Sequence, residues 1–169
     1  MRYLFTLLLV IIGVVFRVAP HPWNFAPVGA IALFAGATFD DRRSAFFVPL
    51  VTMFIGDLFI GIHSLMPVIY ATYALIAVLG MLLRERRHSV AAIGGAAFAS
   101  ATIFFVITNF AVWFIGTTYP KTFDGFVACY VAAIPFFDRT LASDLLFSAI
   151  FFGAFALAER RIPAFTKNR

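Results

Sequence analysis

The sequence predicts an all-α integral membrane protein with six transmembrane helices, a re-entrant or interfacial segment before the last helix, and both termini in the cytoplasm. Three observations predict this fold class: 63% of the 169 residues are hydrophobic, only 12% are charged, and the mean hydropathy is +0.98. A soluble domain of this size cannot bury so many apolar side chains, so they are expected to face lipid and one another. Residues 1–169 are therefore predicted to form one polytopic membrane domain.

The first apolar run, residues 3–18, is expected to be a retained transmembrane helix. A cleavable signal peptide needs small residues at its cleavage site, whereas Arg17 and Pro20 occupy that region. Prolines recur within residues 20–27 and predict a structured loop, because proline removes a backbone donor and interrupts a helix.

A second helix is expected at residues 27–39, a run that is short for a span and rich in glycine and alanine. Small residues recur in it at four-residue spacing, in the pairs Ala26/Ala30 and Ala32/Gly36. Such a face lets another helix backbone approach closely. The pattern is consistent with internal packing, which we favour, and with docking of a partner subunit.

The remaining transmembrane helices are predicted at residues 45–61, 67–83, 90–116 and 140–158. The apolar segment 126–137 lies between the last two of these spans. It is too short to cross a bilayer, it contains Pro135, and the adjacent charges of Asp138 and Arg139 follow it. These features favour a re-entrant or interfacial segment over a seventh crossing.

The orientation follows from the distribution of basic residues. With six spans, the side that holds both termini carries ten of the Lys and Arg residues, and the opposite side carries only Arg17, Lys121 and Arg139. Because cytoplasmic loops are enriched in Lys and Arg, both termini are predicted to be cytoplasmic. The formal net charge of +5 is then explained by membrane orientation, and no nucleic-acid partner is expected.

This topology brings most of the unusual polar and aromatic groups to the outer ends of the helices and to the external loops. Ionisable groups inside a membrane segment are unfavourable in lipid and often mark a functional site. A ligand-binding site that opens to the outside is therefore predicted, with the candidate residues His21, Trp23, Asn24, Asp57, His63, Asn109, Trp113, Tyr119, Cys129, Tyr130, Asp138, Arg139 and Asp144.

Each candidate also has a structural interpretation. Asp57 and Asp144 are equally well explained as buried carboxylates that pair with Arg17, Arg139 or the backbone amides of a helix N-terminus. Asn109 suits an interhelical hydrogen bond, and the tryptophans suit an aromatic belt at the membrane boundary.

Two further chemistries are considered and set aside. Cys129 and two histidines have side chains that bind soft metals, but they come from separate loops without ligand spacing, so no metal is predicted and the cofactor is left open. Asp57 and Asp144 suggest an aspartyl dyad, but neither is preceded by the Gly-x-Gly of intramembrane aspartyl proteases. The protein is not expected to be an enzyme.

Four stretches carry a resemblance to a known family: Pro22–Gly36, Asp57–His63, Thr108–Trp113, and Cys129–Phe137 followed by Asp144–Leu146. Over most of residues 17–153 they resemble the DUF6580 type of uncharacterised bacterial membrane protein. The arrangement of spans also resembles, in architecture only, the substrate-binding S-components of energy-coupling-factor (ECF) vitamin transporters.

The second resemblance implies a solute-binding or uptake protein of the bacterial inner membrane. It would take a vitamin- or cofactor-sized small molecule into an outward-facing pocket. The chain has no phosphate-binding Gly-x-x-x-x-Gly-Lys-[Ser/Thr] loop, so active uptake would require a transmembrane coupling subunit with ATPases. The alternative is a structural or assembly subunit whose polar groups pair with one another, and this alternative predicts no external cavity.

Overall fold

The computed structural model describes residues 2–20 and 24–161, and within residues 2–5 it describes the backbone only. The described ranges are helical and contain no strand. Their elements are α1 (Arg2–Val18), α2 (Val28–Thr38), α3 (Arg42–Ile60), α4 (Met66–Leu83), the short 3-10 helix η1 (Arg84–Arg86), α5 (Val90–Ile115) and α6 (Phe123–Arg161).

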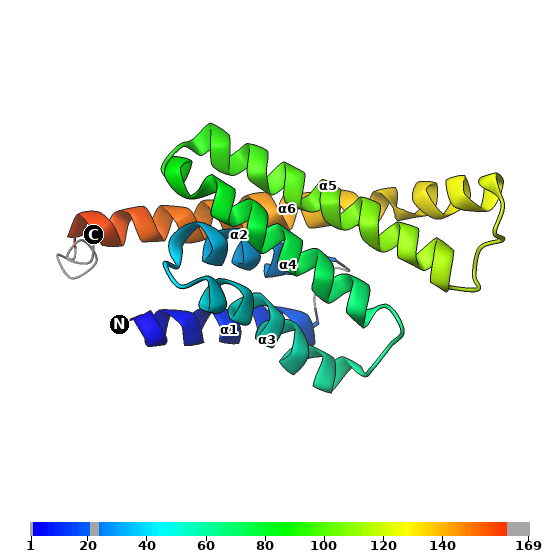
Figure 1. Ribbon diagram of the computed structural model, residues 1–169, viewed down its shortest axis with the longest axis horizontal. Helices are drawn as coiled ribbons and strands as arrows, with labels where there is room; N and C mark the ends of the chain where they lie inside the picture. Colours follow the sequence, from blue (N-terminus) through cyan, green and yellow to red (C-terminus); the bar gives the residue numbers. More distant parts are fainter. Residues whose placement is uncertain (1, 21–23, 162–169) are drawn as a thin grey trace.

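Successive helices run in opposite directions along one bundle, so that the start of α1 and the end of α6 lie at the same end (Figure 1). The first five predicted helices are confirmed, with ends that differ by a few residues at most. Local signals set several of these ends. The Asp41 carboxylate accepts hydrogen bonds from the backbone N–H groups of Arg43 and Ser44 at the start of α3, and Gly61 ends α3 with a positive φ of 107°.

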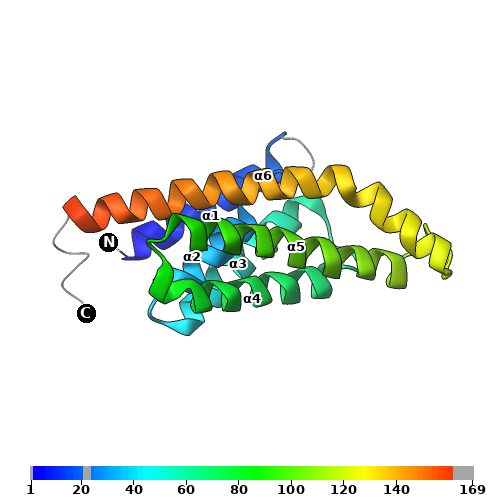
Figure 2. The same cartoon turned by 90° about the horizontal axis from the view of Figure 1, so that it is seen from above.

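The predicted break between the segment 126–137 and the last helix at 140–158 is wrong, because α6 is one continuous helix of 39 residues that includes both. Pro135 lies inside α6, whose axis bends along this part of its length (Figure 2). Proline removes one backbone hydrogen bond and kinks a helix without always ending it. At 1.5 Å per residue α6 is about 58 Å long, roughly twice the hydrocarbon thickness.

Four helices are long and apolar enough to cross a membrane: α3, α4 with its η1 extension, α5 and α6. The shorter apolar helices are residues Thr6–Val18 of α1 and the whole of α2. Length and composition therefore support a helical membrane protein with four long candidate spans.

The small-residue helix α2 occupies the centre of the bundle. All of its residues from Val28 to Ala37 are buried, and it packs mainly on α4, α3 and α6. Gly36 and Gly80 let α2 and α4 approach closely, since a Cβ built on Gly36 would lie 2.1 Å from the Ala77 carbonyl oxygen. The prediction of internal packing for this helix is confirmed, and its Ala/Gly face is not open to a partner.

The C-terminal end of α2 is held by a basic residue from another element. The Arg84 guanidinium, at the start of η1, donates hydrogen bonds to the carbonyl oxygens of Gly36 and Phe39. Carbonyl groups at a helix C-terminus lack intrahelical donors, and the helix dipole favours a cation there. Arg84 therefore satisfies carbonyl groups at the half-buried C-terminal end of α2.

The hairpin of α5 and α6 extends past the loop between α3 and α4, at the end opposite the start of α1 and the end of α6 (Figures 1 and 2). Contacts between its two arms hold it together. The Tyr130 hydroxyl donates to the Val106 carbonyl at 2.7 Å, and the Trp113 indole donates to the Pro120 carbonyl at 2.9 Å. These contacts join the two arms and the connecting loop near the tip of the hairpin.

Candidate functional site

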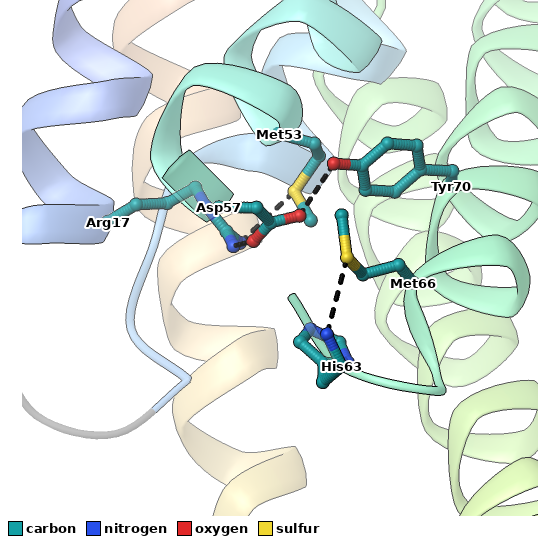
Figure 3. Close-up of polar contacts among 6 residues, drawn as sticks. All are labelled: Arg17, Met53, Asp57, His63, Met66 and Tyr70. Atoms are coloured by element: carbon teal, nitrogen blue, oxygen red, sulfur yellow. Dashed lines mark hydrogen bonds and ion pairs between the residues drawn. The ribbon is translucent and has the colours of Figure 1, made fainter. Parts of the chain in front are cut away.

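The first polar cluster joins α1, α3 and α4 (Figure 3). Arg17, in the last turn of α1, forms an ion pair with Asp57, in the last turn of α3. The Tyr70 hydroxyl of α4 donates to the other oxygen of Asp57 at 2.6 Å, and the Arg17 guanidinium also contacts the Met53 sulfur at 3.1 Å. Asp57 is 2% exposed and Arg17 is 14% exposed, so the pair is largely shielded from solvent.

A glycine makes room for this ion pair. A Cβ built on Gly56 would lie 2.4 Å from the Arg17 Nε atom, so the guanidinium rests directly on the α3 backbone. The charges of Arg17 and Asp57 cancel inside the bundle, and both oxygens of the carboxylate have a donor. The structural interpretation of Asp57, as a carboxylate paired with Arg17, is thereby confirmed.

The second polar cluster surrounds Asp144, which α6 places at the N-terminal end of α2. The side chain of Asp144 is 2% exposed, and the Ser100 hydroxyl of α5 donates to its Oδ2 at 2.8 Å. The backbone N–H of Ala30 in the first turn of α2 also bonds to this carboxyl group. Pro27, the residue that precedes α2, supplies no side-chain cap, so Asp144 provides from another helix the anion that a helix N-terminus favours.

A cavity of ≈ 750 Å³ lies between these two clusters. Its exposed wall comes from the loops that follow α1 and α3, and its buried wall comes from the helices. Its volume falls within the roughly 300–1,000 Å³ that small-molecule sites occupy. The lining residues are Arg17, Ala19, Pro20, Asn24, Ala26, Gly29, Met53, Ile60, His63, Leu65, Ile69, Tyr73, Ile76, Ser100, Phe104, Thr140 and Asp144.

The structure brings three of the predicted site residues together at this cavity: Asn24, His63 and Asp144. Asn24 has a positive φ of 63° in the loop after α1, and the His63 backbone N–H lies 3.5 Å from the Met66 sulfur at the start of α4 (Figure 3). Asp57 lies behind the cavity wall and reaches it only through its partner Arg17. His21 and Trp23 lie outside the described residues.

The other predicted residues do not line the cavity. Asn109 donates a side-chain hydrogen bond to the Phe105 carbonyl of its own helix, and the buried Cys129 thiol contacts the Asn109 carbonyl at 3.5 Å. Trp113, Tyr119 and Tyr130 belong to the projecting α5–α6 hairpin, and Asp138 and Arg139 are exposed on α6. These positions remain predictions as ligand contacts.

Several lining residues were missed as site residues: Gly29, Tyr73, Ser100 and Phe104. The sequence offered a reason to consider Ser100 and Gly29 as site residues, because both lie on small-residue faces, where polar or backbone groups can approach a neighbouring helix. It offered no such reason for Tyr73 and Phe104, since aromatic side chains in apolar runs are usually lipid-facing or core. The two rings lie 5.2 Å apart between centroids.

Among the described residues, no group of three or more His, Cys, Asp or Glu side chains is placed to hold a metal ion. Asp57 and Asp144 have separate partners, and no hydrogen bond joins them in the described part of the chain. The arrangement offers binding groups in a cavity rather than a paired acid and base.

The fold and the site together define a helical membrane protein with a small-molecule-sized cavity between its helices. The chain belongs to the DUF6580 family, a family of unknown function whose sequence model matches residues 1–165. Searches of curated proteins and of solved structures found no match.

Proposed function

We propose that this protein binds a small molecule in its cavity at the outer face of the bacterial inner membrane and takes part in the uptake of that molecule. The observation that carries the proposal is the cavity of ≈ 750 Å³, which has a mostly apolar wall and a few convergent polar groups. Binding sites for small molecules typically combine these two features.

The charge distribution supports the orientation. Seven of the described basic residues lie at the end of the bundle where α1 starts and α6 ends: Arg42, Arg43, Arg84, Arg86, Arg87, Arg160 and Arg161. Cytoplasmic ends of membrane helices are enriched in such residues. The cavity is lined by loops of the opposite end, which the proposal places outside the cell.

Uptake against a gradient requires an energy source outside this chain, because the sequence lacks a phosphate-binding loop for ATP. A transmembrane coupling subunit with ATPases is the partner that the proposal implies. Such a subunit would contact helices other than α2, whose small-residue face is buried.

The second candidate function is a structural or assembly subunit. The ion pair of Arg17 with Asp57 and the hydrogen bond of Ser100 with Asp144 support it, because both satisfy polar groups internally. This role does not require a cavity, and for that reason we favour ligand binding.

The experiment is native mass spectrometry of the protein purified in mild detergent, followed by thermal stabilisation with a library of vitamins and cofactors. A co-purified or stabilising small molecule is expected. Thr140→Trp fills the cavity and should abolish the effect, since Thr140 lines it. Thr102→Trp is the matched control, because both threonines donate to a carbonyl four residues earlier and Thr102 does not line the cavity.

A protein that carries no small molecule and is stabilised by none would contradict ligand binding and favour the structural role. Equal loss of binding in Thr140→Trp and Thr102→Trp would place the ligand elsewhere.

A further inference from the structure

We propose that the cavity selects small organic cations and that Asp144 is the counter-ion of the bound cation. This inference rests on the proposed function and names its substrate class. It follows from the balance of charges around the cavity, from the hydrogen bonds that the Asp144 carboxylate can still accept, and from the aromatic side chains beside it.

The two carboxylates near the cavity differ in how they are compensated. Asp57 is paired with Arg17, so these two charges cancel. Asp144 receives hydrogen bonds from a hydroxyl and a backbone amide, and within the described residues no Lys, Arg or His forms an ion pair with it. A buried carboxylate without an opposite charge is strongly unfavourable, so a cation brought by a ligand would stabilise the ionised form of Asp144.

The Asp144 carboxylate has lone-pair positions left for further hydrogen bonds. A carboxylate has two oxygens with about four lone-pair positions. The Ser100 hydroxyl and the Ala30 N–H use two of these, and the side chain also lines the cavity. An ammonium or amidinium group in the cavity would therefore add charge-assisted hydrogen bonds without displacing the existing donors.

The walls beside Asp144 fit the body of such a ligand. Tyr73 and Phe104 line the same cavity, with their rings inclined by 34°. Aromatic faces attract cations and stack on planar groups. Met53, Ile69 and Ile76 supply apolar surface around them. The predicted ligand has a positive nitrogen head and a planar or apolar body.

An anionic ligand fits the cavity poorly. The charge of the Arg17 guanidinium is balanced by Asp57, and its Nε atom, buried against α3 without a hydrogen-bond partner among the described residues, is not open to a ligand. A carboxylate or phosphate placed near Asp144 would add a second negative charge to a buried site. His63 lies in the exposed loop, away from the buried wall.

The test uses three probes of nearly the same shape and different charge: benzamidinium, benzamide and benzoate. Each is titrated at millimolar concentration into the detergent-purified wild-type protein, and the dissociation constant is measured by calorimetry or thermal shift. Benzamidinium should bind about tenfold or more tightly than benzamide or benzoate, because charge-assisted hydrogen bonds are about twice as strong as neutral ones.

Asp144→Asn keeps the shape of the side chain and removes its charge, so the preference for benzamidinium should fall about tenfold. Asp124→Asn is the matched control, because Asp124 is exposed on the same helix and does not line the cavity. It should leave the preference unchanged. If Asp144→Asn does not fold, the ranking of the three probes on the wild-type protein still decides the inference.

Equal or tighter binding of benzamide or benzoate, or no binding of benzamidinium, overturns cation selection. Binding of a neutral or anionic vitamin in the library screen then leaves the proposed function standing. If no small molecule of any charge binds, the proposed function fails together with the inference.

Discussion

The carboxylate of Asp144 lies against the backbone of Gly29, so that a Cβ built on Gly29 would lie 2.4 Å from the Asp144 Oδ1 atom. This close approach brings α6 to the N-terminal end of α2 and places a buried acid beside the cavity. The absence of a side chain at Gly29 therefore allows Asp144 to reach its place beside the cavity.

The first prediction concerns Gly29→Ala. The added methyl group overlaps the Asp144 carboxylate, so α2 or α6 must move, and overpacking of this kind costs about 1–3 kcal/mol. Thermal denaturation in detergent should show a lower melting temperature. Gly94→Ala is the control on α5, because a Cβ there meets nothing within 4 Å. A Gly29→Ala protein as stable as the control would contradict the close approach.

The second prediction concerns the ion pair of Arg17 with Asp57. Removal of one partner leaves a buried charge, which costs about 3–5 kcal/mol when the pair is fully shielded. Arg17→Met and Asp57→Asn should each lower the free energy of unfolding strongly. The double variant should lose much less of this free energy than the sum of the two single losses. Tyr70→Phe should cost less, about 1.5–3 kcal/mol, the value of one hydrogen bond to a charged group. Additive losses in the double-mutant cycle would show that the two side chains act independently.

The third prediction concerns the C-terminal end of α2. Arg84→Met removes the donors to the Gly36 and Phe39 carbonyls, and an unsatisfied buried acceptor costs about 1–3 kcal/mol. Arg86→Met makes the same change of charge at an exposed position of η1 and should have little effect. Comparable melting temperatures for the two variants would argue against a capping role for Arg84.

The fourth prediction concerns the Asp41 cap of α3 and its pH dependence. The Ser44 hydroxyl, followed by the N–H groups of Arg43 and Ser44, lowers the pKa of Asp41 below its ordinary value of 3.8. Because the folded-state pKa is depressed, the cap stabilises the protein fully above the unfolded pKa and loses this effect as the pH falls through the folded pKa.

Asp41→Ala should therefore melt below the wild-type protein at pH 6, and the difference should disappear at pH values well below 3.8. Asp41→Asn keeps a capping oxygen but has no titratable group. Its melting temperature at pH 6 should lie between those of Asp41→Ala and the wild-type protein. A difference in melting temperature that does not change with pH would exclude the Asp41 carboxylate as its cause.

Most of the helix pattern could be predicted from the sequence, because apolar run length and charged or proline-rich loops are local properties. The exception is the segment around Pro135, where proline and the neighbouring charges suggested an interruption that the helix does not make. A proline in a helix is tolerated when neighbouring elements hold it, and those neighbours are not visible in the sequence.

The candidate site was predicted only in part. Asp144, Asn24 and His63 could be identified because polar residues are rare in this chain, and a pairing of Asp57 with Arg17 was one of several alternatives. Tyr73 and Phe104 could not be identified, since the chain contains 23 phenylalanines and 5 tyrosines and only packing selects among them.

The sequence by itself determined that this chain is a bundle of apolar helices with its basic residues concentrated at one end. The reason is that each segment's preference for lipid or water depends on its own hydropathy and charge, whichever helices it contacts. Only the tertiary structure decided that α2 is buried between Asp144 and Arg84 and that a cavity lies beside it. The physical reason is that close approaches such as that of Gly29 to Asp144 depend on helix crossings between residues far apart in the chain.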